Sequence, residues 1–224
     1  MRWLPSDPLG HFVALTLLLL PLWFIAWFNT ADLLLWPAVM GSGALLNALH
    51  PGLVEGFEGS ARALQVLTGI DVPRPQGIAQ VVVEVNVLSY AWNLPVLFSL
   101  LFATDRRFFS YRYVALAYIG LLPLLVWGIC FDILKTVALQ SGPEAHAFLG
   151  YRGFQLELIA LGYQFGYLML PVIGAVVLWV GMNRGMLLLL LDRLAPTPEP
   201  APDPQPRSPL VRKARAARSA SRET

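Results

Sequence analysis

Residues Glu157–Arg184, ELIALGYQFGYLMLPVIGAVVLWVGMNR, decide the class of this protein. No charged residue occurs between Leu158 and Val180. An α-helix rises about 1.5 Å per residue, so about 20 apolar residues cross a hydrocarbon core roughly 30 Å thick. The stretch therefore predicts a membrane-spanning helix that ends near Asn183 and Arg184.

This span also carries small and polar residues. Gly162 and Gly166 are one helical turn apart, a spacing that lets another helix approach closely. Gln164 lies between them and needs a hydrogen-bond partner in lipid, so we expect it to face protein. Tyr163 and Tyr167 lie near the outer half of the span. These five residues are the predicted contact face for a neighbouring helix or a partner.

The composition supports a membrane protein and excludes several other classes. The chain has 224 residues, of which 56% are hydrophobic and 13% charged, whereas soluble domains have about 25% charged residues. A net charge of +2 gives no reason to expect nucleic acid as a partner. One cysteine excludes an internal disulfide, and the scattered histidines and absent phosphate-binding motifs predict no metal and no cofactor.

Three further apolar stretches predict spans, which makes four in total. They are His11–Phe28, Leu88–Thr104 and Tyr113–Phe131. The first is longer than the core of a secretory signal peptide, and no A-x-A cleavage site follows it, so we interpret it as an uncleaved anchor.

Residues 32–49 are apolar but follow the first span with almost no room for a turn. Pro37, Gly41 and Gly43 also disfavour a lipid-facing helix. We interpret this segment as an interfacial helix or an outward extension of the first helix; a re-entrant segment is the other alternative.

Residues 50–86 predict a small β-hairpin. Ala63–Thr68 and Ile78–Val87 have strand-like composition, and in the second strand valines alternate with polar residues, as in a half-buried strand. Gly69–Gly77, with two prolines, is the predicted turn. The predicted organisation is residues 1–31, first span; 32–86, extracytoplasmic helix and hairpin; 87–184, three further spans; and 185–224, a cytoplasmic tail.

The distribution of charge predicts the orientation. With a cytoplasmic N-terminus, residues 32–86 and 132–157 lie outside, and they hold only four of the 16 Lys and Arg residues: Arg62, Arg74, Lys135 and Arg152. The Lys and Arg bias toward the cytoplasm sets topology. The sequence thus predicts an all-α membrane protein with four transmembrane helices, both termini cytoplasmic, and a small extracytoplasmic helix and β-hairpin module.

The tail alternates proline with small residues and then becomes rich in Arg, Ser and Ala. Such a composition cannot bury a core, which predicts disorder. We interpret its basic cluster, Arg212–Arg222, as a segment near anionic headgroups of the lipid bilayer rather than as a nucleic-acid site.

Polar residues gather near the predicted outer membrane face, and ionisable groups at membrane depth are candidates for function. The predicted outer-face polar cluster consists of Glu84, Asn86, Tyr90, Asn93, Asp132, Lys135 and Glu157. The simpler interpretation is that these residues cap helices and join the bundle, with Asp132 and Lys135 paired at i and i+3.

Two alternative functions follow from the residues. One is a membrane thiol enzyme with Cys130, His146 and Arg152 as catalytic residues, since a nucleophilic cysteine needs a base and an oxyanion-stabilising group. A lone cysteine in an apolar segment is more often a packing residue. The other alternative is a subunit of a membrane transport complex.

Two stretches resemble a known family: VEVNVLSYAWNLPVLFSLLFA, residues 83–103, and residues 157–184. Both are similar to the exosortase H-associated membrane proteins, and the similarity extends from Trp23 to Arg184, including LLLWPAV and HPGLVE. The resemblance implies a bacterial inner-membrane location and a non-enzymatic accessory role beside an exosortase, a transpeptidase-like enzyme that processes C-terminal sorting tails. It implies the exosortase or its tailed substrates as partners, and it assigns no active-site residues.

Overall fold

The computed structural model describes residues 7–194 except Gln76, Arg106 and Phe108. The predicted disordered tail and its basic cluster lie almost entirely outside these residues; only α8 (Arg184–Leu194) is described there. The contacts within the chain divide it into two units, Met1–Leu190 and Leu191–Thr224. The helices and strands between Pro8 and Met182 belong to the first unit.

The first helix, α1, runs without interruption from Pro8 to Leu49. The carboxylate of Asp7 accepts a hydrogen bond from the Gly10 N–H at 2.8 Å and caps its start. Its 42 residues make a helix about 63 Å long, roughly twice the thickness of a hydrocarbon core. Residues 32–49 thus continue the first helix, and at least one end of α1 projects beyond the hydrocarbon.

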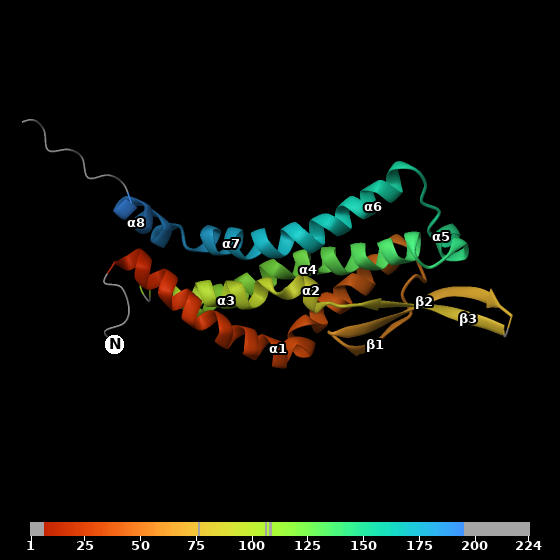
Figure 1. Cartoon of the computed structure of the whole chain (residues 1–224), viewed down its shortest axis with the longest axis horizontal. Coiled ribbons are helices and arrows are strands. Elements are labelled where there is room, and N and C mark those ends of the chain that lie inside the picture. The colour runs from red at the N-terminus through yellow and green to blue at the C-terminus, as the bar shows by residue number, and fades with distance from the viewer. Residues whose placement is uncertain (1–6, 76, 106, 108, 195–224) are drawn as a thin grey trace, which may run out of the picture. The chain divides into compact units, whose positions relative to one another are not determined.

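The β-structure is an antiparallel three-stranded sheet in the order β1-β2-β3, formed by Gly56–Ser60, Ala63–Arg74 and Gly77–Val85 (Figure 1). The predicted two-stranded hairpin is therefore wrong in two respects. β1, GFEGS, has two glycines and no alternation, so its sequence does not look like a strand. β2 continues through most of the predicted turn to Arg74, with an irregular register between Leu67 and Asp71.

The alternation predicted for β3 is confirmed in its second half. Val83 and Val85 are buried, whereas Gln80 and Glu84 are exposed. Val87 does not extend the strand but precedes the short helix α2 (Leu88–Ala91). Because Pro95 has no N–H to donate to the turn before it, α2 and α3 (Asn93–Ala103) are separated at Trp92.

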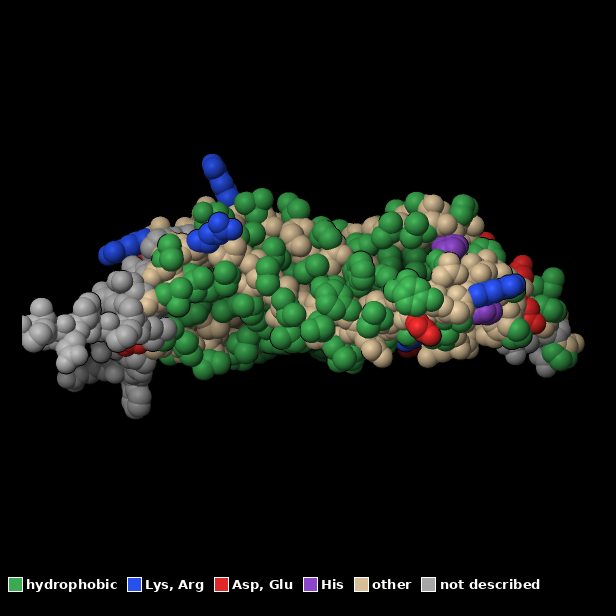
Figure 2. All heavy atoms as spheres, turned by 90° about the horizontal axis from the view of Figure 1, so that it is seen from above, with side chains coloured by type: hydrophobic (Ala, Val, Ile, Leu, Met, Phe, Trp, Pro, Cys, Tyr) green, Lys and Arg blue, Asp and Glu red, His purple; other side chains and the backbone are tan. Residues whose placement is uncertain are grey.

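Within the part of the chain that the structure describes, three helical segments are long and apolar enough to cross a membrane: α1, α4 (Tyr111–Leu139), and the combined segment Phe154–Met182. The combined segment consists of α6 (Phe154–Gln164), the π-helix η1 (Phe165–Met169) and α7 (Leu170–Met182). Leu88–Ala103 is a shorter apolar helix. On the face seen in Figure 2, hydrophobic side chains cover the middle and charged ones lie toward the two ends.

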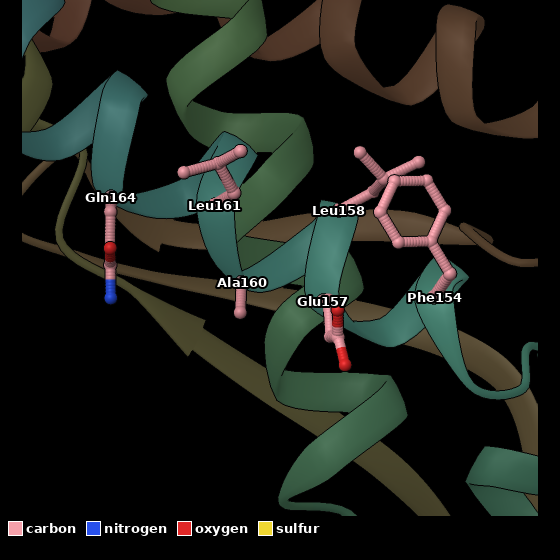
Figure 3. A pocket seen from close by; sticks show the side chains of 6 residues that line it. All are labelled: Phe154, Glu157, Leu158, Ala160, Leu161 and Gln164. Carbon is pink, nitrogen blue, oxygen red and sulfur yellow. The ribbon is translucent and has the colours of Figure 1, made fainter.

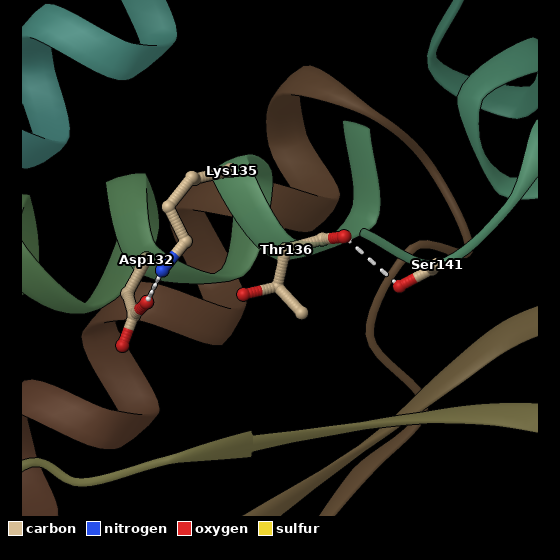
Figure 4. Close-up of polar contacts among 4 residues, drawn as sticks. All are labelled: Asp132, Lys135, Thr136 and Ser141. Carbon is tan, nitrogen blue, oxygen red and sulfur yellow. Dashed lines mark hydrogen bonds and ion pairs between the residues drawn. The ribbon is translucent and has the colours of Figure 1, made fainter. Parts of the chain in front are cut away.

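The third predicted span and the loop after it need correction. α4 continues past Phe131 to Leu139, so Asp132 and Lys135 lie in a helix rather than in a polar loop. Their mutual ion pair lets the helix continue, and Ile133 and Val137 extend its buried face. The Ser141 hydroxyl donates to the Thr136 carbonyl at 3.0 Å at the end of α4 (Figure 4), and α5 (Pro143–Leu149) follows.

Glycines allow α4 and the α6–η1–α7 segment to approach closely. A Cβ at Gly162 would lie 2.2 Å from the Phe131 ring, and one at Gly166 would lie 3.2 Å from the Gly128 Cα. The Trp127 indole N–H also donates to the Gly162 carbonyl at 3.0 Å. The predicted small-residue face therefore packs against a helix of the same chain.

We predict that Gly162→Ala destabilises the protein because the new methyl group must displace the Phe131 ring, at a cost of about 1–3 kcal/mol. Gly181→Ala is the matched control, since no heavy atom lies within 4 Å of the Cβ position at Gly181. Unfolding in detergent, followed by tryptophan fluorescence, measures both. Equal stability of the two variants would contradict this account of the helix interface.

Candidate functional site

A group of polar and aromatic side chains joins α2, α4, α6 and η1. Its members, which we call the Tyr–Asp–Lys cluster, are Tyr90, Asp132, Lys135, Tyr163 and Tyr167. The Lys135 Nζ lies 2.9 Å from an Asp132 carboxylate oxygen (Figure 4) and 3.9 Å from the centroid of the Tyr163 ring. Two elements of the sequence that lie far apart thus meet around one ammonium group.

Three tyrosines form the aromatic part of this cluster. Tyr163 and Tyr167 are one turn apart and stack with their ring centroids 5.8 Å apart, and Tyr90 meets Tyr167 edge-on at 6.0 Å. The Tyr90 ring is buried against Gly128, where a Cβ would lie 2.5 Å from it. The Tyr90 hydroxyl group lies close enough to the side chains of Asp132 and Tyr163 to interact with both. Gly128 therefore makes room for the side chain that connects α2 to the ion pair.

The two charged side chains of the cluster, Lys135 and Asp132, compensate each other. The side chains of Lys135 and Asp132 are 17% and 13% exposed, so each charge is largely removed from solvent. The ammonium group is compensated by the carboxylate and by the face of the Tyr163 ring. No group of three or more His, Cys, Asp or Glu among the described residues could hold a metal ion. The arrangement joins helices and leaves no free acid or base.

The other members of the predicted outer-face polar cluster do not join this group. Glu84 is exposed on β3, and Glu157 is exposed on α6. The carbonyl of Asn86 accepts from the Ser89 N–H at 3.2 Å, at the start of α2. Asn93 is buried at the start of α3 beside α7, with no hydrogen-bond partner for its amide. Of the seven predicted residues, Tyr90, Asp132 and Lys135 are those brought together.

The structure does not assemble the proposed thiol site. The Cys130 thiol is buried and faces the Ser42 carbonyl of α1 at 3.7 Å. The His146 Nδ1 lies 2.9 Å from the Ala138 carbonyl, and eight residues along α4 place Ala138 about 12 Å from Cys130. Arg152 is exposed in the segment before α6. A base beyond hydrogen-bond reach cannot activate the thiol, so this hypothesis is not supported by the geometry.

His50 instead joins two distant segments at the sheet end of the helices. Its Nε2 lies 2.5 Å from the Tyr151 hydroxyl oxygen, which connects the end of α1 to the segment between α5 and α6. Burial raises the pKa of Tyr151 above its ordinary value. This contact fixes the α5–α6 segment beside α1, and no sequence pattern predicts it.

The five residues of the predicted contact face do not share one environment: some pack against the rest of the chain and others are exposed. Gly162 and Gly166 are buried against α4, and Tyr163 belongs to the Tyr–Asp–Lys cluster, whereas Gln164 and Tyr167 are exposed. Of the two predicted alternatives, a neighbouring helix or a partner, the glycines have the first, because α4 occupies their side of the helix. Helical geometry explains the division, since Gln164 is two residues, or about 200°, from each glycine.

The exposed side of α6 forms a shallow groove. It is lined by Phe154, Glu157, Leu158, Ala160, Leu161 and Gln164. These side chains follow one helix face, with Glu157 near its start and Gln164 at its end (Figure 3). The groove thus combines apolar side chains with a carboxylate and an amide that are open to a neighbour.

The apolar helices define the class: this is a membrane protein that crosses the bilayer more than once. The chain belongs to the exosortase H-associated membrane protein family, whose model matches residues 6–186. The resemblance inferred from residues 83–103 and 157–184 is confirmed. No curated protein and no solved structure matches the chain significantly.

We predict that Lys135→Met destabilises the protein by about 1–3 kcal/mol, because it leaves the largely buried Asp132 carboxylate without its charged hydrogen-bond donor. The double variant Lys135→Met, Asp132→Asn should be more stable than Lys135→Met alone, since the uncompensated charge is gone. Unfolding in detergent measures both, with the exposed Glu144→Gln as a control. A double variant less stable than Lys135→Met would show that the ion pair is not the connection we describe.

Proposed function

We propose that this chain is a non-enzymatic accessory protein of an exosortase-type C-terminal sorting system and acts by contact with the exosortase or its substrates. The observation that carries the proposal is Gln164. Its side chain is exposed on a membrane-spanning helix, and no hydrogen bond from its amide to another described residue is found. In lipid an unpartnered amide is unfavourable, so a helix of another protein is its natural partner.

Asn29 on α1 shows why Gln164 is distinctive. Asn29 is also an exposed amide on an apolar helix, but its Nδ2 donates to the Ile25 carbonyl of the same helix at 2.7 Å. Thr30 likewise donates to the Ala26 carbonyl at 2.9 Å. Asn29 and Thr30 are thus satisfied within their own helix, whereas the Gln164 amide is available to a second helix.

The backbone next to Gln164 supports a contact role. η1 is a π-helix in which the Leu170 N–H bonds to the Phe165 carbonyl, five residues earlier. Pro171 follows directly, and because proline lacks an N–H and its ring crowds the preceding turn, the wider turn accommodates it. π-Helical turns are frequent at functional sites. Tyr167 on this turn is 42% exposed and adds an aromatic surface to the proposed contact.

We predict that Gln164→Leu lowers the amount of exosortase that co-purifies with the tagged protein from native membranes. Loss of an interhelical hydrogen bond of about 1–2 kcal/mol corresponds to about fivefold or more in affinity. The stability of the isolated variant should not fall, because the exposed side chain makes no hydrogen bond to another described residue that the change would remove.

Asn29→Leu is the matched control, since it also replaces an exposed amide by leucine on an apolar helix. It should leave co-purification unchanged. Equal recovery of exosortase with Gln164→Leu and with the unaltered protein would refute the α6 contact. Failure of the unaltered protein to recover an exosortase or its tailed substrates would refute the accessory role itself.

We also propose that the chain resides in a bacterial inner membrane with four spans, Leu88–Ala103 being the fourth, and with both termini in the cytoplasm. The charge distribution supports this orientation, since the loop Asp105–Ser110 and residues 195–224 are rich in arginine. The shorter helix is about 24 Å long, about 6 Å less than a hydrocarbon core of roughly 30 Å, a mismatch that local thinning of the bilayer accommodates.

Single cysteines introduced into a Cys130→Ala background test this topology. Glu58→Cys and Glu144→Cys should react with a membrane-impermeant maleimide in intact spheroplasts, whereas Asp7→Cys and Asp105→Cys should react only after the membrane is disrupted. Labelling of Asp105→Cys in intact spheroplasts would show that Leu88–Ala103 does not cross.

A further inference from the structure

The C-terminal half of α1 and the strand β1 enclose a second groove, of about 390 Å³. It lies apart from the α6 surface used above. Its lining residues are Trp36, Met40, Gly43, Ala44, Asn47, Val54, Glu55, Gly56 and Phe57. The groove therefore runs from an apolar helix face to the first strand of the sheet.

The walls of this groove are fixed by internal contacts. The Asn47 amide donates to the Val54 carbonyl at 2.6 Å and accepts from the Val54 N–H at 2.9 Å. The Phe57 ring lies on Gly43, where a Cβ would be 2.8 Å from it. Because both contacts hold the segment between α1 and β1, a ligand would find the groove already formed.

One wall of the groove is an open sheet edge. β1 is the first strand in the order β1-β2-β3, and among the residues that the structure describes it pairs with β2 alone. Natural edge strands are commonly protected by lysine, proline or a covering element. β1 contains neither lysine nor proline, and Glu58 is its one charged residue, so its own sequence does little to block the addition of another strand.

The helix beside this edge carries an apolar stripe. Leu33, Trp36 and Met40 follow one face of α1 and are 79%, 52% and 38% exposed. An open sheet edge does not occur in contact with lipid tails, so β1 and the groove lie at or beyond the membrane surface. An apolar stripe that continues to such a site favours a protein partner.

The charges at the groove favour a basic ligand. Glu55 lines it and accepts from the Gln80 Nε2 at 2.7 Å, and Glu58 is exposed on β1. The nearby cation, Arg62, has its guanidinium group 3.9 Å from the centroid of the Phe28 ring and donates to the Phe28 carbonyl. Glu58 therefore places a carboxylate on the edge strand itself, and the Glu55 carboxylate lies over the neighbouring strands, next to Gly69 and Gln80.

We propose that the groove binds an extended peptide segment of another protein, which adds as a strand to the free edge of β1. Apolar side chains of the peptide pack on Trp36 and Met40, and a basic side chain pairs with Glu58. Backbone hydrogen bonds supply affinity in this mode, and alternate side chains supply specificity. This inference goes beyond the proposed function and does not depend on the α6 contact.

The test uses the full chain in nanodiscs of phosphatidylcholine, which has no net charge. The probe is a fluorescent peptide of alternating valine and lysine, about nine residues long, which suits a single strand. Its twin has the same side chains but is N-methylated at every peptide bond, so it cannot donate the N–H hydrogen bonds that a strand makes to its neighbour. Fluorescence anisotropy measures binding of each.

We expect the unmodified peptide to bind and the N-methylated twin not to bind. Met40→Lys and Glu58→Lys should each weaken binding about tenfold or more, which is about 1.4 kcal/mol. The matched control is Ile78→Lys on the opposite edge strand, where Ile78 is 77% exposed; it should leave binding unchanged.

Each contrary result would overturn the proposal. Equal binding of the N-methylated twin would exclude strand addition, and equal weakening by Ile78→Lys would exclude the β1 edge as the site. Binding to nanodiscs without protein would show adsorption to lipid, and no binding at all would exclude a basic extended peptide. Because no exosortase is present in this assay, its outcome is separate from that of the co-purification experiment.

Discussion

The close approach of α4 to the α6–η1 segment is the contact on which the rest of the helical packing depends. At Gly128 and Gly166 the two backbones come so near that a single Cβ at Gly166 would lie 3.2 Å from the opposing Cα. Around this point the Trp127 indole bonds to the Gly162 carbonyl, and Phe131 covers Gly162. In a membrane, where lipid is as apolar as the helices, such close packing replaces the hydrophobic effect as the source of association.

This contact also explains how charged residues are accommodated. Gly128 admits the Tyr90 ring, and one turn later Asp132 pairs with Lys135, whose ammonium group faces the Tyr163 ring. A lysine or an aspartate so largely buried would be costly without its partner. Paired with each other and with an aromatic face, they join α2, α4 and α6 and become part of the scaffold, which suits a protein that acts by contact.

The same geometry determines which surface is left for other proteins. Since Gly162 and Gly166 are taken up by α4, the residue between them must point away from the bundle, and Gln164 therefore faces the surroundings. The family of this chain is named for its association with exosortase H. An unpartnered amide beside a π-helical turn on a spanning helix is a surface consistent with such an association. The groove beside β1 is a second, chemically different surface at the sheet end of the chain.

The sequence by itself determined the membrane class, the family, most of the helical spans and the ion pair between Asp132 and Lys135. Hydropathy over some 20 residues and i, i+3 spacing are local properties, and local properties can be read from the chain. It did not reveal β1, because GFEGS becomes a strand through pairing with β2 rather than through its own preference. Nor could it separate Cys130 from His146, bring Tyr90 to Lys135, or assign Gly162 and Gly166 to α4, because each of these depends on which helix packs against which. Only the tertiary structure decided those contacts, since they join residues far apart in the chain through packing that has no local sequence signal.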